Sequence, residues 1–268
     1  MNTANSSPTP NRLHERLQGG HVGLCLGVRQ ARTPDVAQIA AACGFDALYI
    51  DLEHSTAPLD VTSAICIAAR GAGVTPLVRV PTIGGAWIGR VLDGGASGVI
   101  VPHVERVDEA QGIVRQAKYP PLGRRSVMGA GPQSGYRAVP LADVNRTGNA
   151  GVMVIAMLET PAGIAAADAI AAVEGIDMLL IGSNDLCTEL GVPGQLRDAR
   201  VRDAYATVAA ASSAHGRVLG IGGIRGDLEL QRELVALGAR FIIAGNDVSY
   251  LMAAAREDVG RLRTLDPA

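Results

Sequence analysis

The chain contains 268 residues, of which 48% are hydrophobic and 19% are charged, and its formal net charge is −2. This length and composition indicate a globular protein that buries a large apolar core. A nearly balanced charge provides no clustered positive surface, which argues against nucleic acid or an anionic membrane as a partner, and no apolar run is long enough to span a bilayer.

The chain begins with a polar segment, MNTANSSPTP, that contains two prolines. It has no charged start followed by an apolar core, so we expect a disordered tail over residues 1–10 rather than a signal peptide. Residues 11–268 are then expected to form one domain.

After a short helix expected over residues 12–18, the pattern alternates between strand and helix. Residues 22–28 predict a buried strand, and residues 33–44 predict a helix with Thr33 as its N-cap, Pro34 as its first residue and Gly44 after its end. Seven more pairs follow without a repeated sequence. Their strands are expected at 47–51, 75–80, 97–102, 152–159, 177–182, 217–222 and 240–245, and their helices at 59–73, 85–96, 107–119, 161–173, in a region ending near 215, at 227–238 and at 247–263.

Eight strand–helix pairs in a chain of this length predict a (β/α)8 barrel, the TIM barrel, which typically has ~250 residues. A doubly wound parallel sheet is the main alternative. That fold would need a glycine-rich phosphate-binding turn after the first strand, and the segment LGVRQART does not supply one.

The segment from residue 119 to 139 interrupts this alternation. It is rich in Gly, Pro and Arg and has no hydrophobic period, so it predicts a long loop, which we place at the C-terminal face of the barrel. Arg124, Arg125, Tyr136 and Arg137 lie beside glycines that let the backbone approach a ligand, which favours a substrate-covering loop. A contact between subunits is an equally weighted alternative.

The four cysteines, at positions 25, 43, 66 and 187, are widely spaced and form no CxxC motif. This spacing is typical of buried thiols rather than of a disulfide framework. A reducing, cytoplasmic location fits it best.

Two acidic residues follow apolar runs that we expect to be buried strands. Glu159 comes after the run 152–158, and Asp185 follows the run 178–181. Loops at the C-terminal ends of barrel strands form active sites, so these carboxylates are a candidate metal-binding or acid/base pair. The alternative is that each caps the helix that follows it.

Oxygen ligands with no neighbouring cysteine favour Mg²⁺, Mn²⁺ or Co²⁺ over structural zinc. Two carboxylates leave coordination positions for water and for a 2-keto acid, which can chelate the ion through its carboxylate and keto oxygens. The turn at Gly182, Ser183 and Asn184 is expected to begin a helix whose free N–H groups bind the substrate carboxylate.

The second strand ends in YIDLEHS, which places three polar residues at the same face. Asp51 is expected to hydrogen-bond the ring of His54 and raise its basicity, making His54 a general-base candidate. The alternative is a loop histidine satisfied by nearby backbone. Arg79 lies in the apolar run of the third strand, where a guanidinium needs an anion, so it is expected to face the substrate. The alternative is an ion pair with Glu53 or Glu159.

One further acid, Asp93 in VLDGGA, lies at the end of a helix before the fourth strand. That position is at the opposite face of its own barrel. If Asp93 takes part in the chemistry, it does so in the site of a neighbouring subunit.

Taken in order, YIDLEHS, PLVRV, GASGVIVPHVE, KYPPLGRRS, MLETPAGI and GIDMLLIGSNDL resemble the HpcH/HpaI aldolase family over about residues 23–261. The resemblance implies metal-dependent (class II) pyruvate aldolases, related to 2-keto-3-deoxy sugar acid aldolases. It also implies a barrel that exchanges its last helix with a neighbour and assembles as a hexamer, a trimer of dimers.

For individual residues, the resemblance implies Glu159 and Asp185 as metal ligands and His54 as the acid/base, assisted by Asp51. It implies Arg79 on the pyruvate oxygen and Asp93 near the adjacent subunit's site. The chain departs from several family members at Ser183 and Asn184, where they have proline and alanine, and in the loop from 126 to 137, which faces the aldehyde half of the substrate in the family.

These features predict a metal-dependent aldolase that reversibly cleaves a 4-hydroxy-2-keto acid to pyruvate and an aldehyde. The only lysine is Lys118, in a helix, which argues against Schiff-base chemistry. Two alternatives stay open: a CoA-thioester lyase of the citramalyl- or malyl-CoA type, which would use Arg124, Arg125 and Arg137, and a barrel without catalysis that serves as a binding subunit.

Overall fold

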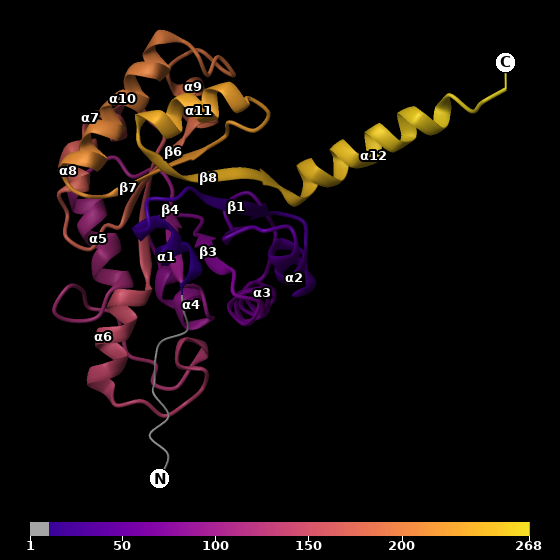
Figure 1. The fold of residues 1–268 in the computed structure, drawn as a ribbon. Helices are drawn as coiled ribbons and strands as arrows, with labels where there is room; N and C mark the ends of the chain where they lie inside the picture. Colours follow the sequence, from indigo (N-terminus) through magenta and orange to yellow (C-terminus); the bar gives the residue numbers. More distant parts are fainter. Residues whose placement is uncertain (1–10, 268) are drawn as a thin grey trace.

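The structure, a computed structural model, describes residues 11–267, so the tail expected over residues 1–10 lies outside the described residues (Figure 1). Eight parallel strands pair in chain order, and β1 also pairs with β8, which closes the barrel. The predicted (β/α)8 barrel is confirmed. The strands are β1 (Gly23–Val28), β2 (Ala47–Asp51), β3 (Thr75–Arg79), β4 (Gly98–Val101), β5 (Met153–Leu158), β6 (Met178–Gly182), β7 (Val218–Gly222) and β8 (Ala239–Asn246).

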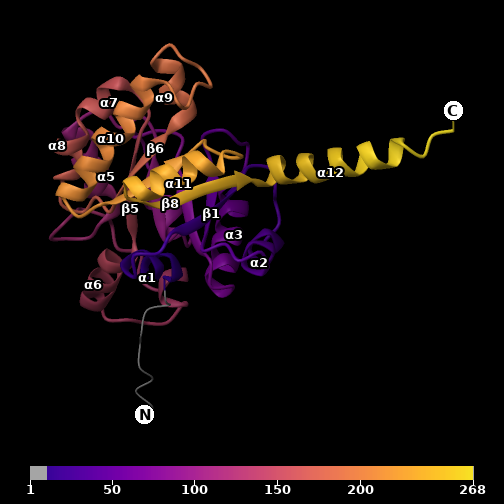
Figure 2. The same ribbon diagram turned by 45° about the horizontal axis from the view of Figure 1, so that its top comes forward.

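Most of the helices follow a strand and cover the barrel from outside, as Figure 2 shows from a second side. No helix among residues 11–267 is both long and apolar enough to cross a membrane. The α-helices are α1 (Arg12–Gln18), α2 (Asp35–Ala42), α3 (Leu59–Gly71), α4 (Trp87–Asp93), α5 (Val107–Ala117), α6 (Leu141–Gly151), α7 (Pro161–Ala165), α8 (Ala167–Ala171), α9 (Ser183–Glu189), α10 (Ala199–Ala214), α11 (Leu228–Leu237) and α12 (Asp247–Arg263).

The strands are apolar throughout because both of their faces are covered. In β2, Ala47 and Tyr49 point into the barrel, whereas Leu48 and Ile50 pack against the surrounding helices. Helix α1 closes the amino-terminal end of the barrel, where Leu13 is fully buried among the inward-facing side chains. This packing needs Gly23, because a Cβ there would lie 2.4 Å from the Leu13 side chain.

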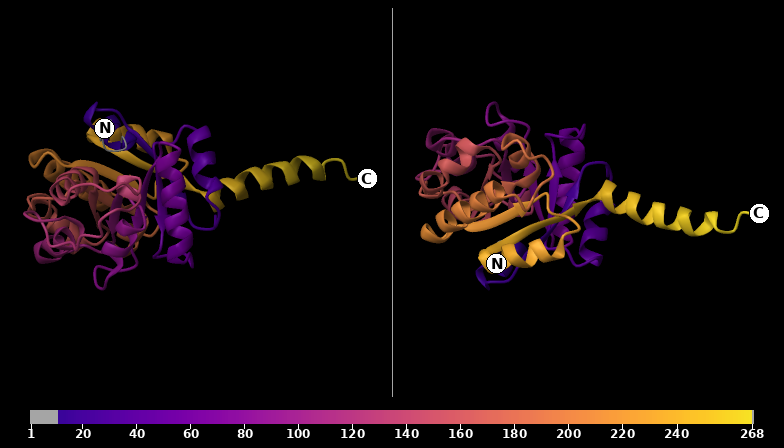
Figure 3. Two further views of the ribbon diagram at one scale, coloured as in Figure 1. Left: turned by 90° about the horizontal axis from the view of Figure 1, so that it is seen from below. Right: turned by 90° about the horizontal axis from the view of Figure 1, so that it is seen from above.

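The last helix, α12, leaves the barrel at the end of β8 and projects away from it in every view (Figures 1 and 3). None of its residues is buried. Its start is fixed to the barrel because the Asp247 carboxylate accepts the backbone N–H groups of Arg29, Gln30 and Ala31. Apolar side chains such as Leu251 and Leu262 are 70% and 62% exposed along the helix.

Some details differ from the sequence-based predictions. Helix α6 was not predicted, because its sequence, LADVNRTGNAG, combines weak helix formers with few apolar residues, and it buries none of them. The N-cap of helix α2 is Pro34, not Thr33 as predicted, and no side chain forms a capping hydrogen bond at this end. Cys25, Cys66 and Cys187 are buried free thiols as predicted, but Cys43 is exposed.

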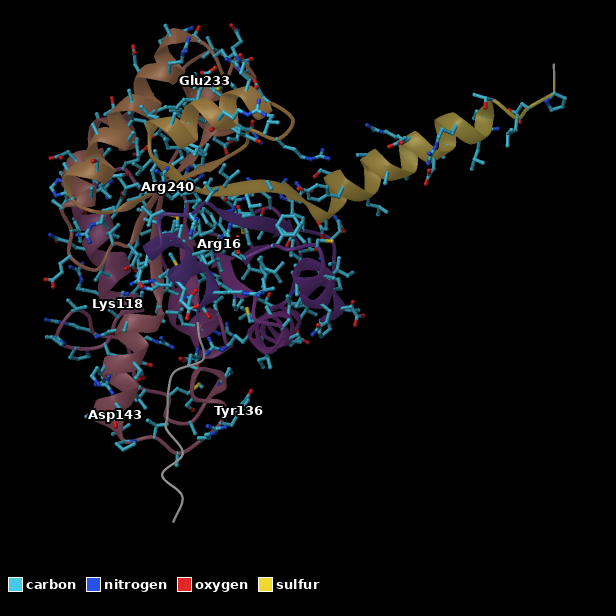
Figure 4. The ribbon with its side chains drawn as sticks, viewed as in Figure 1. Arg16, Lys118, Tyr136, Asp143, Glu233 and Arg240 are labelled. Atoms are coloured by element: carbon cyan, nitrogen blue, oxygen red, sulfur yellow. The ribbon has the colours of Figure 1, made fainter. Side chains whose placement is uncertain are left out.

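The long loop between α5 and α6 lies at the amino-terminal end of the barrel, so its predicted place at the opposite face is wrong. The physical reason is topological: this segment leads from a helix into strand β5, and such connections return to the starts of the strands. In the structure, Arg70 near the end of α3 contacts both the carbonyl of Gln133 in the loop and Ser97, which directly precedes β4. Figure 4 shows Tyr136 with Asp143 of α6 at the edge of the molecule away from α12.

Candidate active site

Several polar side chains meet where the strands end. Asp51 and Arg79 are the last residues of β2 and β3, and Gly182 is the last residue of β6. Glu159 directly follows β5, and Asp185 lies in the first turn of α9. Parallel strands therefore bring these residues, which are far apart in sequence, to one end of the barrel.

Asp51 and Arg79 form a buried, two-pronged ion pair. Arg79 donates from Nε to Asp51 Oδ1 at 3.0 Å and from Nη2 to Oδ2 at 2.7 Å, and Arg29 adds a bond from its Nε to Oδ2 at 2.9 Å. Burial by itself would raise the pKa of Asp51, but the hydrogen bonds and the positive charge of Arg79 outweigh it, so the pKa is lowered. Asp51 is therefore an anion that fixes Arg79.

The remaining edge of Arg79 contacts Glu53, whose Oε2 lies 2.6 Å from Nη1. The guanidinium also lies over the ring of Tyr49, 5.2 Å from its centre. Arg79 is only 2% exposed. Its two ion-pair partners are the carboxylates of Asp51 and Glu53 at the barrel mouth. The alternative of an ion pair with Glu53 is correct, whereas no contact with Glu159 forms.

The predicted hydrogen bond between Asp51 and the ring of His54 is absent from the described contacts. Asp51 Oδ1 instead accepts the backbone N–H groups of Glu53 and His54, each at 3.1 Å. The reason is that the chain turns directly after β2, which points these N–H groups at Asp51. The His54 ring is half-exposed and its Nε2 lies 3.9 Å from Glu53 Oε2, so it stands at the rim of the site.

Glu159 is a buried carboxylate with one free oxygen. Its Oε1 accepts the backbone N–H of His103 at 2.9 Å, whereas its Oε2 has no hydrogen-bond partner among the described residues. Gly182 makes room for this oxygen, because a Cβ there would lie 2.5 Å from Oε2. Thr160, not Glu159, caps α7, so the capping alternative for Glu159 is wrong.

The pKa of Glu159 is raised to about 7. Burial is the main cause; His103 opposes the increase, and the negative charges of Asp185 and Glu53 add to it. The site therefore holds more negative charge than its own cations balance. A divalent cation fits this donor set of carboxylate oxygens.

Within residues 11–267, no three or more His, Cys, Asp or Glu side chains form a group that could hold a metal ion. A cation held by the two carboxylates of Glu159 and Asp185 would need water or substrate oxygens to complete its coordination.

His103, which is not among the residues predicted from the sequence, bridges two acids of the site. Its Nδ1 lies 3.3 Å from Glu159 Oε1 and its Nε2 lies 3.3 Å from Glu53 Oε1. Its backbone has φ of 52°, a left-handed conformation that is uncommon for a residue other than glycine. The available signal was a histidine directly after the fourth strand, in the segment PHVE.

Ser183 and Asn184 begin α9, directly after Gly182. Ser183 is fully buried, and the Asn184 side chain packs against Gly223, where a Cβ would lie 3.2 Å away. Their use in binding a substrate carboxylate stays a prediction.

Asp93, Arg125 and Tyr136 lie at the other end of the barrel. Asp93 was expected there, and its Oδ1 forms an ion pair of 2.7 Å with Nη2 of Arg125. Arg125 and Tyr136 were predicted to cover the substrate, and within one chain this is wrong, because the loop that carries them lies at the amino-terminal end. Only a second subunit could bring these residues to a barrel mouth.

Lys118 is also distant from the mouth. Its ammonium group is buried against the carbonyls of Asn149 and Val152 and lies 3.3 Å from the Asp177 carboxylate, just before β6. These contacts account for the lysine as a structural residue at the amino-terminal end.

A closed (β/α)8 barrel with acids and a paired arginine at the carboxyl ends of its strands defines a barrel enzyme. The chain belongs to the HpcH/HpaI aldolase/citrate lyase family, whose family model matches residues 29–254. It is accordingly a carbon–carbon lyase of the aldolase class.

Two relatives and one solved structure illustrate the similarity. The 4-hydroxy-4-methyl-2-oxoglutarate aldolase tasA of Hapsidospora irregularis is 41% identical, over 95% of this chain and 96% of that protein. A hydroxypyruvate/pyruvate aldolase of Roseovarius nubinhibens is 35% identical, over 87% and 90%. The crystal structure of an HpcH/HpaI aldolase from Desulfitobacterium hafniense superposes with a TM-score of 0.89 at 30% identity, covering 95% of this chain and 97% of that one.

Proposed function

We propose that this enzyme reversibly cleaves a 4-hydroxy-2-keto acid to pyruvate and an aldehyde. The observation that carries the proposal is the buried Glu159 carboxylate, which has a free oxygen and a raised pKa at the end of the barrel that also holds Asp185 and Arg79. The relative that is 41% identical is named for a 4-hydroxy-2-keto acid, which supports this class of substrate.

Glu159 and Asp185 are the residues that would hold a divalent cation, Mg²⁺, Mn²⁺ or Co²⁺. When bound, such an ion withdraws charge from the keto group of the substrate. The free Oε2 of Glu159 and the space that Gly182 leaves beside it fit this role. The N–H groups around Gly182, Ser183 and Asn184 are proposed to bind the substrate carboxylate.

The chain's own residues then supply the proton transfers and the charge stabilisation. His54, at the rim, accepts the proton of the C4 hydroxyl, directly or through a water. As the C3–C4 bond breaks, its electron pair moves toward the keto oxygen, where Arg79 stabilises the negative charge. Protonation at C3 gives pyruvate, and the aldehyde leaves. Asp51 holds Arg79 and the backbone of His54, so it positions both groups.

The test is an assay of pyruvate release from a panel of 4-hydroxy-2-keto acids. The reverse reaction, condensation of pyruvate with aldehydes, is assayed as well, and both assays are run with several divalent ions. We expect turnover that a chelator abolishes. Cleavage that persists in excess chelator would refute the metal-assisted route.

The same assay separates the alternative of a CoA-thioester lyase. That activity would need a basic surface near the mouth, and the arginines considered for it lie on the loop at the amino-terminal end. We expect free acids to be cleaved and CoA esters to be inert. Tight binding of a keto acid without turnover would instead support a binding subunit.

We also propose that α12 packs on a neighbouring subunit in a hexamer, a trimer of dimers, and that Asp93 is lent to the adjacent site. The exposed apolar residues of α12 support this, as does Leu24 of β1, which is 39% exposed beside β8. Truncation after Asn246 should yield smaller species in analytical ultracentrifugation. A full-length monomer would refute the assembly. A cytoplasmic location stays a prediction.

A further inference from the structure

Arg29 is a second arginine at the mouth, directly after β1, and the reaction proposed above gives it no role. Its Nε donates to Asp51 Oδ2 at 2.9 Å, and the same oxygen accepts Nη2 of Arg79 at 2.7 Å. The two guanidinium groups therefore lie side by side on one carboxylate. Arg79 is buried, whereas the side chain of Arg29 is 38% exposed, so a ligand in the mouth can reach it.

The guanidinium of Arg29 keeps N–H groups that bind nothing. Its Nη groups have no hydrogen-bond acceptor within residues 11–267, and Asp51 is the one carboxylate of this part of the chain that pairs with it. Asp51 also accepts two bonds from Arg79 and the backbone N–H groups of Glu53 and His54. Because Asp51 shares its charge among these donors, Arg29 is only partly neutralised. The planar oxygen pair of a carboxylate matches the N–H groups that remain.

The backbone that carries Arg29 is fixed on two sides. The Asp247 carboxylate accepts the backbone N–H groups of Arg29, Gln30 and Ala31. Arg32 donates from Nη1 to the carbonyls of Arg29 and Ala31. Among the described residues Asp247 forms no ion pair with an arginine, so it holds the segment without occupying the guanidinium of Arg29. A donor that is fixed before binding loses little conformational entropy when a ligand arrives.

Arg29 lies across the mouth from the residues proposed to hold the cation. The closed barrel runs in order from β1 to β8, so β1 and β5 are opposite each other, and Glu159 directly follows β5. In the proposed reaction the carboxylate and keto group of the substrate lie on the Glu159 side, with the keto oxygen at Arg79. A substrate that extends from there across the mouth brings the groups on its C4 to Arg29, because Arg29 and Arg79 share Asp51.

We propose that Arg29 binds a second carboxylate, carried on C4 of the substrate, and that the enzyme therefore selects 4-hydroxy-2-keto diacids. This inference rests on the proposed aldol cleavage and names its substrate class. Arg29 forms charge-assisted hydrogen bonds to the carboxylate and takes no part in bond cleavage. When the C3–C4 bond breaks, this carboxylate leaves with the aldehyde, so the products are pyruvate and an aldehyde that is itself an acid.

The first experiment measures binding without turnover. Isothermal titration calorimetry of the full-length enzyme with Mn²⁺ compares 2-oxoglutarate with 2-oxopentanoate. Both have five carbons and lack the C4 hydroxyl, so neither can undergo the cleavage, and they differ only in a carboxylate or a methyl group at C5. The diacid should bind about ten-fold more tightly or better. Arg29→Met should remove most of this preference and change the affinity for the monoacid by less than about three-fold.

The second experiment measures the same preference during turnover. Pyruvate release is followed with 4-hydroxy-2-oxoglutarate and with 4-hydroxy-2-oxopentanoate. Arg29→Met should lower kcat/KM for the diacid about ten-fold more than for the monoacid. If Arg29 served only to hold Asp51, both values would fall alike. Arg29→Lys keeps the charge but not the planar fork, so it should retain part of the preference, and it serves as the test if Arg29→Met does not fold.

Arg225→Met is the matched control. Arg225 follows β7 and so lies at the same end of the barrel, where its guanidinium stacks over the ring of Tyr250, 4.9 Å from the centre. The change removes the same charge from this end of the barrel without touching Asp51. The preference for the diacid should therefore persist in Arg225→Met, whereas an effect of net charge alone would reduce it there as well.

The proposal is overturned if the wild type binds the diacid no more tightly than the monoacid, or if Arg29→Met and Arg225→Met change the preference equally. An equal loss of kcat/KM for both substrates in Arg29→Met also overturns it. Failure of the proposed function gives a different result: neither 4-hydroxy-2-keto acid is cleaved, although the wild type still prefers 2-oxoglutarate and Arg29→Met does not.

Discussion

Both ends of the barrel hold an aspartate–arginine pair, but the two pairs leave different groups free. At the carboxyl ends of the strands, Arg79 pairs with two carboxylates, those of Asp51 and Glu53. At the amino-terminal end, Arg125 uses one nitrogen on Asp93 and keeps another without an acceptor.

The free atoms therefore differ in sign. The mouth has a carboxylate oxygen without a partner, Glu159 Oε2, whereas the opposite end has a guanidinium N–H without an acceptor, at Arg125 Nε. By the rule that buried charge needs a partner, the mouth calls for a cation, whereas Arg125 already has its counter-charge in Asp93.

The largest expected effect comes from removing the surplus oxygen at the mouth. Glu159→Ala should lower kcat/KM by roughly 10³-fold or more and abolish tight Mn²⁺ binding, because the cation loses a ligand and the substrate loses its polarised keto group. Steady-state kinetics and electron paramagnetic resonance of Mn²⁺ measure the two effects. Glu174→Gln, an exposed acid between α8 and β6, is the matched control and should change neither. Wild-type Mn²⁺ affinity in Glu159→Ala would remove Glu159 from the metal site.

The paired arginine gives the next effect, on stability as well as on activity. Arg79→Met leaves the Asp51 and Glu53 carboxylates without their shared partner in a buried site, so the free energy of unfolding should fall by about 3–5 kcal/mol. Urea denaturation measures this, with Arg90→Met on the exposed face of α4 as the control. Equal stability of the two variants would show that Arg29 alone neutralises Asp51.

The third effect is a pH dependence of the metal-free enzyme. The pKa of Glu159 rises on folding from its usual 4.5 to about 7, so its neutral form is favoured in the native state. The stability that this provides is complete below pH 4.5 and is lost as the pH rises through about 7. A shift of this size corresponds to about 3 kcal/mol at most.

Thermal unfolding without metal, at a series of pH values from 4.5 to 8, measures that loss. Glu159→Gln, which cannot ionise, should show a flatter profile over this window, and Mn²⁺ should restore the wild-type stability at pH 7. Asp51, whose pKa is lowered, acts in the opposite sense and contributes stability that is lost as the pH falls in the acid range. Parallel profiles for wild type and Glu159→Gln would contradict the assignment.

The barrel could be predicted from the sequence because its strands are buried on both faces and read as apolar runs. Helices such as α5, with Asp108 and Glu109 in its first turn, were equally recognisable. Helix α6 was missed because it buries nothing and so carries no hydrophobic period. The loop before it is irregular as predicted but lies at the other end, since a composition rich in Gly, Pro and Arg suggests ligand binding, whereas a connection from a helix to a strand lies where the strands begin.

At the site, residues at the ends of strands could be predicted because the chain direction of a barrel sends them to one face. Glu159, Asp185, Asp51 and Arg79 follow from that rule. Side-chain partners do not follow from it: whether Asp51 bonds the His54 ring or its backbone depends on the turn after β2. His103 was missed because its contribution requires a left-handed backbone, which one histidine in a sequence does not reveal.

His103 provides the smallest effect and the sharpest comparison within the mouth. Its ring nitrogens Nε2 and Nδ1 each lie 3.3 Å from a carboxylate oxygen, Oε1 of Glu53 and Oε1 of Glu159. The ring therefore lies between the two carboxylates and contacts Glu159 at Oε1, which leaves Oε2 free. His103→Gly should weaken Mn²⁺ binding by about ten-fold, the lower end of what loss of a ligand-orienting partner costs. The fold should tolerate it, because glycine accepts a φ of 52° readily. His103→Asn, which also tolerates this conformation and keeps a polar side chain, should recover part of the affinity. If Mn²⁺ affinity is unchanged in His103→Gly, the backbone N–H bond to Glu159 alone orients the ligand, and the ring acts only on Glu53.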